Sequence, residues 1–240
     1  MLIHSSAIVS PKAIIGENVK ISANCIIYDN VEIGNNVEIG AFCEIGVANH
    51  LSNGRILKIG DNSLIRSHSI FYEGSIFGHS LVTGHRVTIR EGIVAGKNLQ
   101  IGTLSDLQGH TIIGDYVRLH SNVHIGQKTE IGNFVWIFPY VVLTNDPCPP
   151  SNDLIGVKVS DYAVIATMSV ILPGAYIAEG CLVGASTTLK GVTEAHHIYV
   201  GNPAKNIGST SKIKLANGEN AYPWIKHFKR GYPENITKDW

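Results

Sequence analysis

A branched apolar residue recurs at every sixth position over the first part of this chain. The positions are Val9, Ile15, Ile21, Ile27, Ile33, Ile39 and Ile45. A helix repeats near 3.6 residues and a strand at 2, so an interval of six fits neither element alone. The interval is typical of short strands joined by corners, three to a turn, with each turn stacked on the one before it. The spacing therefore predicts a parallel β-helix, in which residues 18 apart lie one above another.

The rhythm is broken twice and then stops. It resumes at Ile59 and again at Val159, and it ends near Lys205. The second break contains the turn formers of 144–153, which predict a loop extruded from the coil near 144–158. We expect an all-β coil domain over 1–205 and a tail over 206–240 that is partly helical and covers the open end of the coil.

Composition excludes several classes of function. The 240 residues carry 19 basic and 19 acidic side chains, so the net charge gives no reason to expect binding to nucleic acid. The first residues lack a basic segment followed by an apolar one, and no apolar run reaches membrane-spanning length. Cys25 and Cys43 lie 18 apart and are expected to be small core residues of a reduced protein. We therefore expect a cytoplasmic protein that does not insert into membranes.

The densest polar cluster lies in 105–125. His124 follows Asp106 by 18 residues, so the two side chains should be stacked on adjacent turns. A carboxylate beside an imidazole fixes its tautomer and supports its action as a general base. His120, in a neighbouring corner, is a second candidate base, and Asn122 is a candidate substrate ligand. The alternative is that these outward histidines are only solvated and that no side chain acts as a base.

Two carboxylates should also stack, because Glu91 follows Glu73 by 18 residues. Like charges at that separation either share a proton or contact a cation. The cation is either a nearby arginine such as Arg90 or the amino group of a substrate. On the second reading, Glu91 is a candidate substrate ligand.

Three segments in the second half carry a family resemblance. They are 159–174, which ends in ILPG, 182–189, which reads LVGASTTL, and 200–205, which reads VGNPAK. Together they resemble the bacterial hexapeptide-repeat acyltransferases, whose coil is a left-handed β-helix. The resemblance implies a homotrimer with active sites between subunits and acetyl-CoA, or another short acyl-CoA, as co-substrate. It implies cofactor contacts at the backbone of Ala166, Thr167, Ala185 and Ser186, which would also steady the oxyanion, and at Lys205 for the phosphates.

The loop beginning Thr144-Asn145-Asp146 resembles that of the nucleotide-amino-sugar N-acetyltransferases. This implies that Asn145 and Asp146 bind the sugar. The galactoside and xenobiotic O-acetyltransferases carry a catalytic histidine in this loop, whereas here the loop has none. A base must then come from His120 or His124, and an amine acceptor is favoured because a neutral amine is a better nucleophile than an alcohol.

The resemblance as a whole implies transfer of an acyl group to the amino group of a nucleotide-linked amino sugar, for lipopolysaccharide or another surface glycan. One alternative is O-acetylation of a sugar hydroxyl. Another is a zinc enzyme like the γ-class carbonic anhydrases, which share this coil and use three histidines; His85, His120 and His124 do not match that family's pattern, so no metal is expected. A non-enzymatic coil, such as an ice-binding protein, would need one regular flat row, which the mixed outward residues do not supply.

Overall fold

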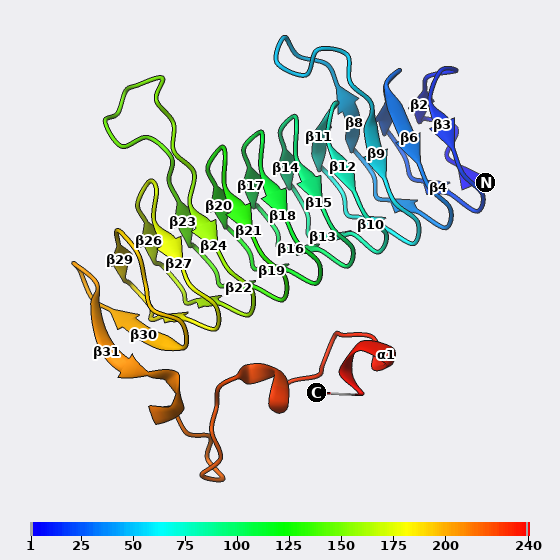
Figure 1. The fold of residues 1–240 in the computed structure, drawn as a ribbon. Helices are drawn as coiled ribbons and strands as arrows, with labels where there is room; N and C mark the ends of the chain where they lie inside the picture. The colour runs from blue at the N-terminus through cyan, green and yellow to red at the C-terminus, as the bar shows by residue number, and fades with distance from the viewer. Residues whose placement is uncertain (1, 239) are drawn as a thin grey trace.

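The computed structural model describes residues 2–238 and 240. It confirms the predicted parallel β-helix, in which short strands wind into three flat sheets (Figure 1). Strands of sheet 1 are β1 (Leu2–Ile3), β4 (Lys20–Ile21), β7 (Glu38–Ile39), β10 (Leu64–Ile65), β13 (Val82–Thr83), β16 (Gln100–Ile101), β19 (Arg118–Leu119), β22 (Trp136–Ile137), β25 (Val164–Ile165), β28 (Leu182–Val183), β30 (His197–Val200) and β31 (Lys205–Ser209).

The other two sheets follow the same stacking order. Sheet 2 contains β2 (Ile8–Val9), β5 (Ile26–Ile27), β8 (Glu44–Val47), β11 (Ile70–Tyr72), β14 (Thr88–Ile89), β17 (Asp106–Leu107), β20 (His124–Ile125), β23 (Val142–Leu143), β26 (Val170–Ile171) and β29 (Thr188–Leu189). Sheet 3 contains β3 (Ile14–Ile15), β6 (Val31–Ile33), β9 (Leu57–Ile59), β12 (Ile76–Phe77), β15 (Val94–Ala95), β18 (Ile112–Ile113), β21 (Glu130–Ile131), β24 (Lys158–Val159) and β27 (Tyr176–Ile177).

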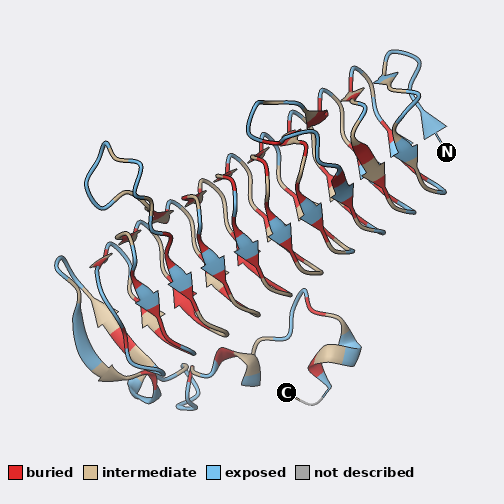
Figure 2. Ribbon diagram, turned by 45° about the horizontal axis from the view of Figure 1, so that its top comes forward, coloured by how far each residue is buried: buried red, intermediate tan, exposed pale blue. Residues whose placement is uncertain are grey.

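The sixth-position residues form the core. In a two-residue strand the second side chain points inward and the first outward, because successive side chains alternate between the faces of a sheet. Ile27, Ile45 and Ile125 are accordingly buried, and the inner faces form one continuous apolar column (Figure 2). Outward residues are therefore displayed in rows along each sheet, and it is these rows that can carry chemistry.

Both breaks in the rhythm are loops at the same edge of the coil. Residues 48–56 leave between β8 and β9, and residues 144–157 leave between β23 and β24, so both project from the corner between sheets 2 and 3 (Figure 1). The predicted loop near 144–158 is thus confirmed. The first loop is fastened by the buried carboxylate of Glu73, which accepts hydrogen bonds from Ser52 Oγ at 2.6 Å and Asn30 Nδ2 at 2.7 Å.

The tail follows a different course from the one expected. β31 pairs antiparallel with β30 and covers the last edge of sheet 1. The chain then forms the 3₁₀ helices η1 (Thr210–Lys212) and η2 (Trp224–Lys226) and the short helix α1 (Glu234–Thr237), so it is partly helical. Its aromatic residues lie along the outer face of sheet 1 instead of over the coil end, and Trp136 Nε1 donates to Tyr232 Oη at 2.8 Å. Within the described residues, no helix has the length and apolar character needed to cross a membrane.

Candidate functional site

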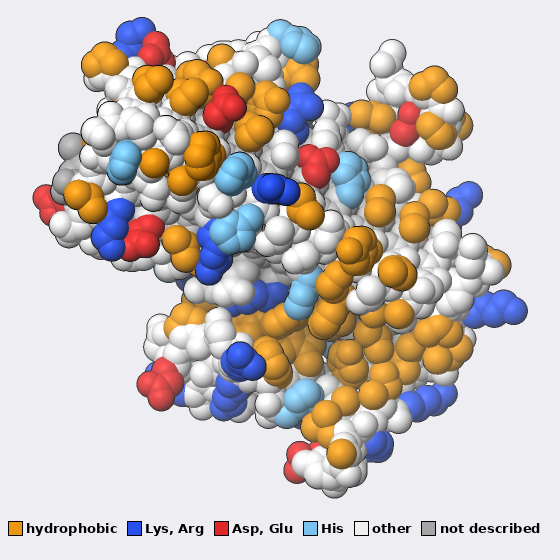
Figure 3. All heavy atoms as spheres, turned by 180° about the vertical axis from the view of Figure 1, so that it is seen from behind, with side chains coloured by type: hydrophobic (Ala, Val, Ile, Leu, Met, Phe, Trp, Pro, Cys, Tyr) orange, Lys and Arg blue, Asp and Glu red, His pale blue; other side chains and the backbone are white. Residues whose placement is uncertain are grey.

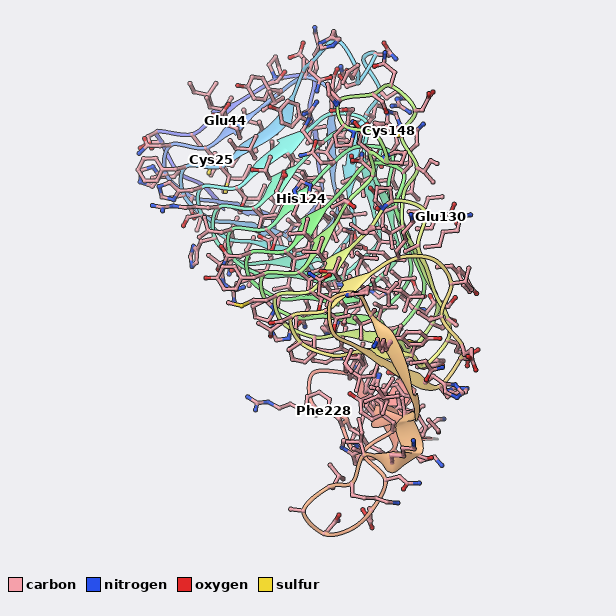
Figure 4. The ribbon with its side chains drawn as sticks, turned by 90° about the vertical axis from the view of Figure 1, so that its left-hand side faces the viewer. Cys25, Glu44, His124, Glu130, Cys148 and Phe228 are labelled. Atoms are coloured by element: carbon pink, nitrogen blue, oxygen red, sulfur yellow. The ribbon has the colours of Figure 1, made fainter. Side chains whose placement is uncertain are left out.

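Asp106 and His124 are brought together on the outer face of sheet 2. They occupy the outward positions of β17 and β20, which are paired in register. Leu107 and Ile125 point into the core and fix the direction of their neighbours. His124 Nδ1 lies 3.0 Å from Asp106 Oδ2, and each side chain is about two-fifths exposed, at 41% and 37%. Figure 4 shows His124 midway along the coil.

A second hydrogen bond fixes the carboxylate. Gln108 Nε2 donates to Asp106 Oδ2 at 2.7 Å. Burial raises the pKa of the Asp106 carboxyl, but the hydrogen bonds from His124 and Gln108 outweigh this effect and leave that pKa below its usual value. Asp106 is therefore ionised at neutral pH and holds the proton of His124 on Nδ1. Nε2 is then the basic nitrogen, and it is the one that can accept a proton from a substrate.

His120 occupies a separate setting. It lies at the corner between sheets 1 and 2, where its ring stacks on Phe138 with centroids 4.6 Å apart. Burial lowers the pKa of the His120 imidazole, which is consequently neutral at pH 7. Of the two histidines proposed as bases, the structure pairs His124 with a carboxylate and places His120 against an aromatic wall.

The residues expected to contact the cofactor gather along the corner between sheets 1 and 2. Ala166 and Thr167 belong to one turn and Ala185 and Ser186 to the next, and Ser186 N donates to Thr167 O at 2.9 Å. Asn122 lies at this same corner, two turns before Thr167, with a left-handed backbone (φ 59°). The Ala166 N–H is used in the ladder, where it donates to Val183 O at 2.8 Å, so this amide cannot steady an oxyanion.

Lys205 opens β31, with its side chain exposed beyond the last turns of the coil.

The residues expected to bind the sugar lie at the opposite edge of sheet 2. Asn145 begins the 144–157 loop and packs over Gly126. Asp146 is occupied by its own loop, because its carboxylate accepts from Ser151 N and Ser151 Oγ, each at 2.7 Å. The hydrogen bond from the Ser151 hydroxyl holds the pKa of Asp146 below its usual value. Asp146 thus shapes the loop, and Asn145 is the residue better placed to meet a ligand.

Glu91 is not available to a substrate. Its side chain is fully buried, and its carboxylate accepts from Asn49 Nδ2 at 2.8 Å and Arg90 Nε at 3.0 Å. Burial raises the pKa of Glu91, but the hydrogen bonds, that from Asn49 foremost, leave it lowered. The expectation of a substrate contact is corrected here, because the cation is Arg90 and the carboxylate fastens the 48–56 loop.

No cluster suited to a metal ion is found in 2–238 and 240: no three His, Cys, Asp or Glu side chains group together there. His85, named in the zinc alternative, instead places Nδ1 2.8 Å from Ser67 Oγ.

The sequence gave no warning of two features of the site. One is Gln108, whose role depends on its side chain reaching back two residues to Asp106. The other is a pair of cavities on sheet 1, of about 360 and 170 Å³, next to the tail. The aromatic residues at outward positions, Trp136 and Phe138, were the available signal for the cavities.

Comparison with known proteins matches residues 12–46 to the family described as "Bacterial transferase hexapeptide (six repeats)". These residues form consecutive turns of the coil, and the same strand register continues to its end. The chain is a hexapeptide-repeat β-helix protein. A curated relative of this hexapeptide-repeat chain is the dTDP-4-amino-4,6-dideoxy-D-glucose acyltransferase of Escherichia coli, 31% identical over 121 residues. That match spans 48% of this chain and 58% of the relative, so it covers less than two thirds of the relative's length.

Solved structures share the fold of the hexapeptide-repeat chain. The UDP-N-acetylglucosamine acyltransferase of Arabidopsis superposes with a TM-score of 0.73 at 18% identity, covering 87% of this chain and 74% of the other. The enzyme of the same name from Campylobacter jejuni gives a TM-score of 0.60 at 20% identity, covering 99% and 81%. At these identities the likeness establishes the β-helix architecture alone.

Proposed function

We propose that this protein transfers an acyl group from acetyl-CoA or another short acyl-CoA to the amino group of a nucleotide-linked amino sugar. The observation that carries the proposal is the Asp106–His124 pair, an oriented base on an accessible face of the coil. The hexapeptide repeats and the relative named as a dTDP-amino-sugar acyltransferase support this substrate class. A role in building a surface glycan such as lipopolysaccharide, in the cytoplasm, is part of the proposal.

The chemistry follows from the geometry of the pair. The amine nitrogen attacks the thioester carbonyl while His124 Nε2 removes a proton, so a C–N bond forms as the C–S bond breaks. The imidazolium is stabilised by Asp106, and its proton passes to the departing thiolate. With the Ala166 amide engaged in the ladder, the N–H groups of Thr167 and Ala185 at the same corner are the ones proposed to steady the oxyanion.

The positions of the ligands follow from the two edges of sheet 2. We place the pantetheine along the corner that carries Thr167 and Ser186, with Lys205 toward the nucleotide phosphates, and the sugar against Asn145 at the opposite edge. Asn122 is retained as a sugar contact. His124 lies on the sheet between these edges, where the two substrates would meet.

The site needs a second chain to enclose it. The pair lies on an open sheet face, and water on that face would weaken each electrostatic interaction. The corner between sheets 1 and 2 also carries a column of bulky side chains, each more than half exposed and with φ of 61° or 62°: Phe42, Leu104, Tyr140 and Met168. Left-handed backbone costs such residues about 1–2 kcal/mol each. Exposed apolar columns of this kind suit an interface, and we propose a homotrimer with active sites between subunits.

One observation also favours a second candidate, transfer to a sugar hydroxyl. A hydroxyl must lose its proton to become a good nucleophile, and an imidazole held by a carboxylate is the group that removes it. The two candidates therefore differ in how strongly they depend on His124.

The test is release of free thiol from acetyl-CoA in the presence of candidate acceptors. dTDP- and UDP-linked sugars with an amino group at position 3 or 4 would be compared with the same sugars carrying a hydroxyl there. Release with the amino sugars alone supports the proposal. Release with the hydroxyl sugars moves the assignment to O-acyl transfer, and release with neither rejects both.

A further inference from the structure

Two cavities on the outer face of sheet 1 form one cleft, here called the tail cleft. The smaller cavity, about 170 Å³, has Trp136 and Phe138 of the coil on one side and Tyr222, Trp224 and Phe228 of the tail on the other. The larger, about 360 Å³, adjoins it through the shared Trp136 side chain. In Figure 3 apolar side chains gather in the lower half of the molecule, where the tail lies against the coils. None of these residues is used by the Asp106–His124 pair.

The smaller cavity is a slot with aromatic walls. Trp136 meets Phe228 edge-on, with centroids 5.4 Å apart, and meets Trp224 edge-on at 6.0 Å. Walls of this kind on two opposed elements favour a flat ring, because aromatic side chains bind rings by stacking and by edge-to-face contact. Figure 4 shows Phe228 on the tail, well removed from His124.

The larger cavity is polar and favours an anion. Its lining includes Arg66, Gln100, His120 and Ser121, and among the described residues that line either cavity none is acidic. One Arg66 nitrogen donates to Thr83 O at 2.7 Å, which holds the guanidinium at the wall of the cavity. Arg118 also lines it, but this side chain is buried and donates to Asn98 Oδ1 and Gly231 O, so it anchors the tail.

We propose that the tail cleft binds a nucleotide, with the base between Trp136 and Phe228 and the phosphates toward Arg66. A slot for a flat ring joined to a cationic, acid-free cavity matches a ligand that carries both a base and phosphates. The ligand is either the nucleotide of the amino sugar or the adenosine part of the acyl-CoA. This inference rests on the proposed function for its two ligands, but not on catalysis.

The position of the cleft relates it to the pair on sheet 2. Ser121 lies on the rim of the larger cavity and precedes His124 by three residues, across the corner. A nucleotide held in the tail cleft therefore has its phosphates at the edge of the face that carries His124. The tail, which no part of the proposed chemistry uses, acquires a role in holding substrate.

Intrinsic fluorescence provides the test, since all three tryptophans of the chain, Trp136, Trp224 and Trp240, belong to the cluster formed by sheet 1 and the tail. The full-length protein would be titrated separately with dTDP, UDP, CoA and pyrophosphate. We expect saturable quenching by a nucleotide and much weaker binding of pyrophosphate. Tighter binding of dTDP or UDP assigns the cleft to the sugar nucleotide, and tighter binding of CoA assigns it to the acyl donor.

Two pairs of variants locate the binding. Phe228→Leu keeps an apolar side chain but removes one wall, and we expect the nucleotide Kd to rise about 5- to 150-fold, the range for loss of one stacking partner. Phe134→Leu is its control, because Phe134 stacks on Tyr116 and Tyr162, outside the cleft. Arg66→Gln should weaken nucleotides with a salt-dependent loss, whereas the exposed Arg86→Gln should not.

The inference is overturned if no nucleotide binds, if pyrophosphate binds as tightly as dTDP, UDP and CoA, or if Phe228→Leu and Phe134→Leu give the same Kd. Because binding is measured without turnover, the cleft can fail while thiol release succeeds, and thiol release can fail while the cleft binds.

Discussion

His124 Nδ1 lies 3.0 Å from Asp106 Oδ2 across two adjacent strands of sheet 2. The contact arises from the coil itself, because β17 and β20 are paired in register and both residues are the outward members of their strands. A parallel β-helix thus builds a base and its orienting carboxylate from residues 18 apart, with no loop needed to bring them together.

Replacing the base tests its role. His124→Gln should lower kcat about 10²- to 10⁴-fold, the usual contribution of a general base, with the melting temperature unchanged. His79→Gln, at an exposed corner elsewhere, is the matched control and should keep full activity. Equal kcat for His124→Gln and the parent protein would remove this histidine from the mechanism.

Asp106→Asn isolates the charge of the carboxylate. The amide retains the size of the side chain but no longer stabilises the imidazolium, so kcat should fall about tenfold or more while KM changes little. Steady-state kinetics at pH 7 measures both constants. A rise in KM with kcat preserved would mean that Asp106 binds substrate instead of orienting His124.

The setting of His120 predicts a pH dependence of stability. Because burial lowers the pKa of His120 in the folded state, the unfolded chain binds the proton more readily, and stability must fall as pH drops below the unfolded value of about 6.5. His120→Phe keeps the stack on Phe138 and removes the titration. Its melting temperature relative to the parent should therefore rise as pH is lowered from 7.5 to 5. A difference that stays constant with pH would contradict this account.

Glu91 should matter for stability and not for substrate affinity. Glu91→Gln exchanges one of the carboxylate's acceptor oxygens for a donor facing Asn49 and Arg90, so we expect a loss of about 1–3 kcal/mol in the free energy of unfolding and an unchanged KM for the sugar. Glu130→Gln is the control, since Glu130 forms a solvent-exposed ion pair with Lys158, a class worth about 0–1 kcal/mol. An increased KM without loss of stability would restore Glu91 as a substrate ligand.

Assembly can be tested at the corner between sheets 1 and 2. Tyr140→Glu places a charge in the exposed apolar column, so the protein should dissociate to folded monomers and lose transfer activity. Light scattering after size exclusion measures the mass, and Ile112→Glu on the exposed row of sheet 3 is the control. A Tyr140→Glu protein that remains both assembled and active would place the interface elsewhere.

The sequence predicted what the coil period dictates. The buried column, the stacking of His124 on Asp106 and the extruded loop all follow from counting in sixes. Glu91 was misjudged because its partner Asn49 comes from the 48–56 loop, whose path lies outside the period. The course of the tail was missed for a similar reason: it depends on Tyr232 and Trp224 meeting outward aromatic residues such as Trp136, a match between distant segments that no local pattern encodes.

The most direct measurement is identification of the product by mass spectrometry and NMR after incubation with acetyl-CoA and a nucleotide-linked amino sugar. The proposal predicts one added acetyl group on the sugar nitrogen, formed by the parent protein and much more slowly by His124→Gln. An acetyl group on a sugar oxygen, or an unchanged acceptor across dTDP- and UDP-linked 3- and 4-amino sugars, would contradict it.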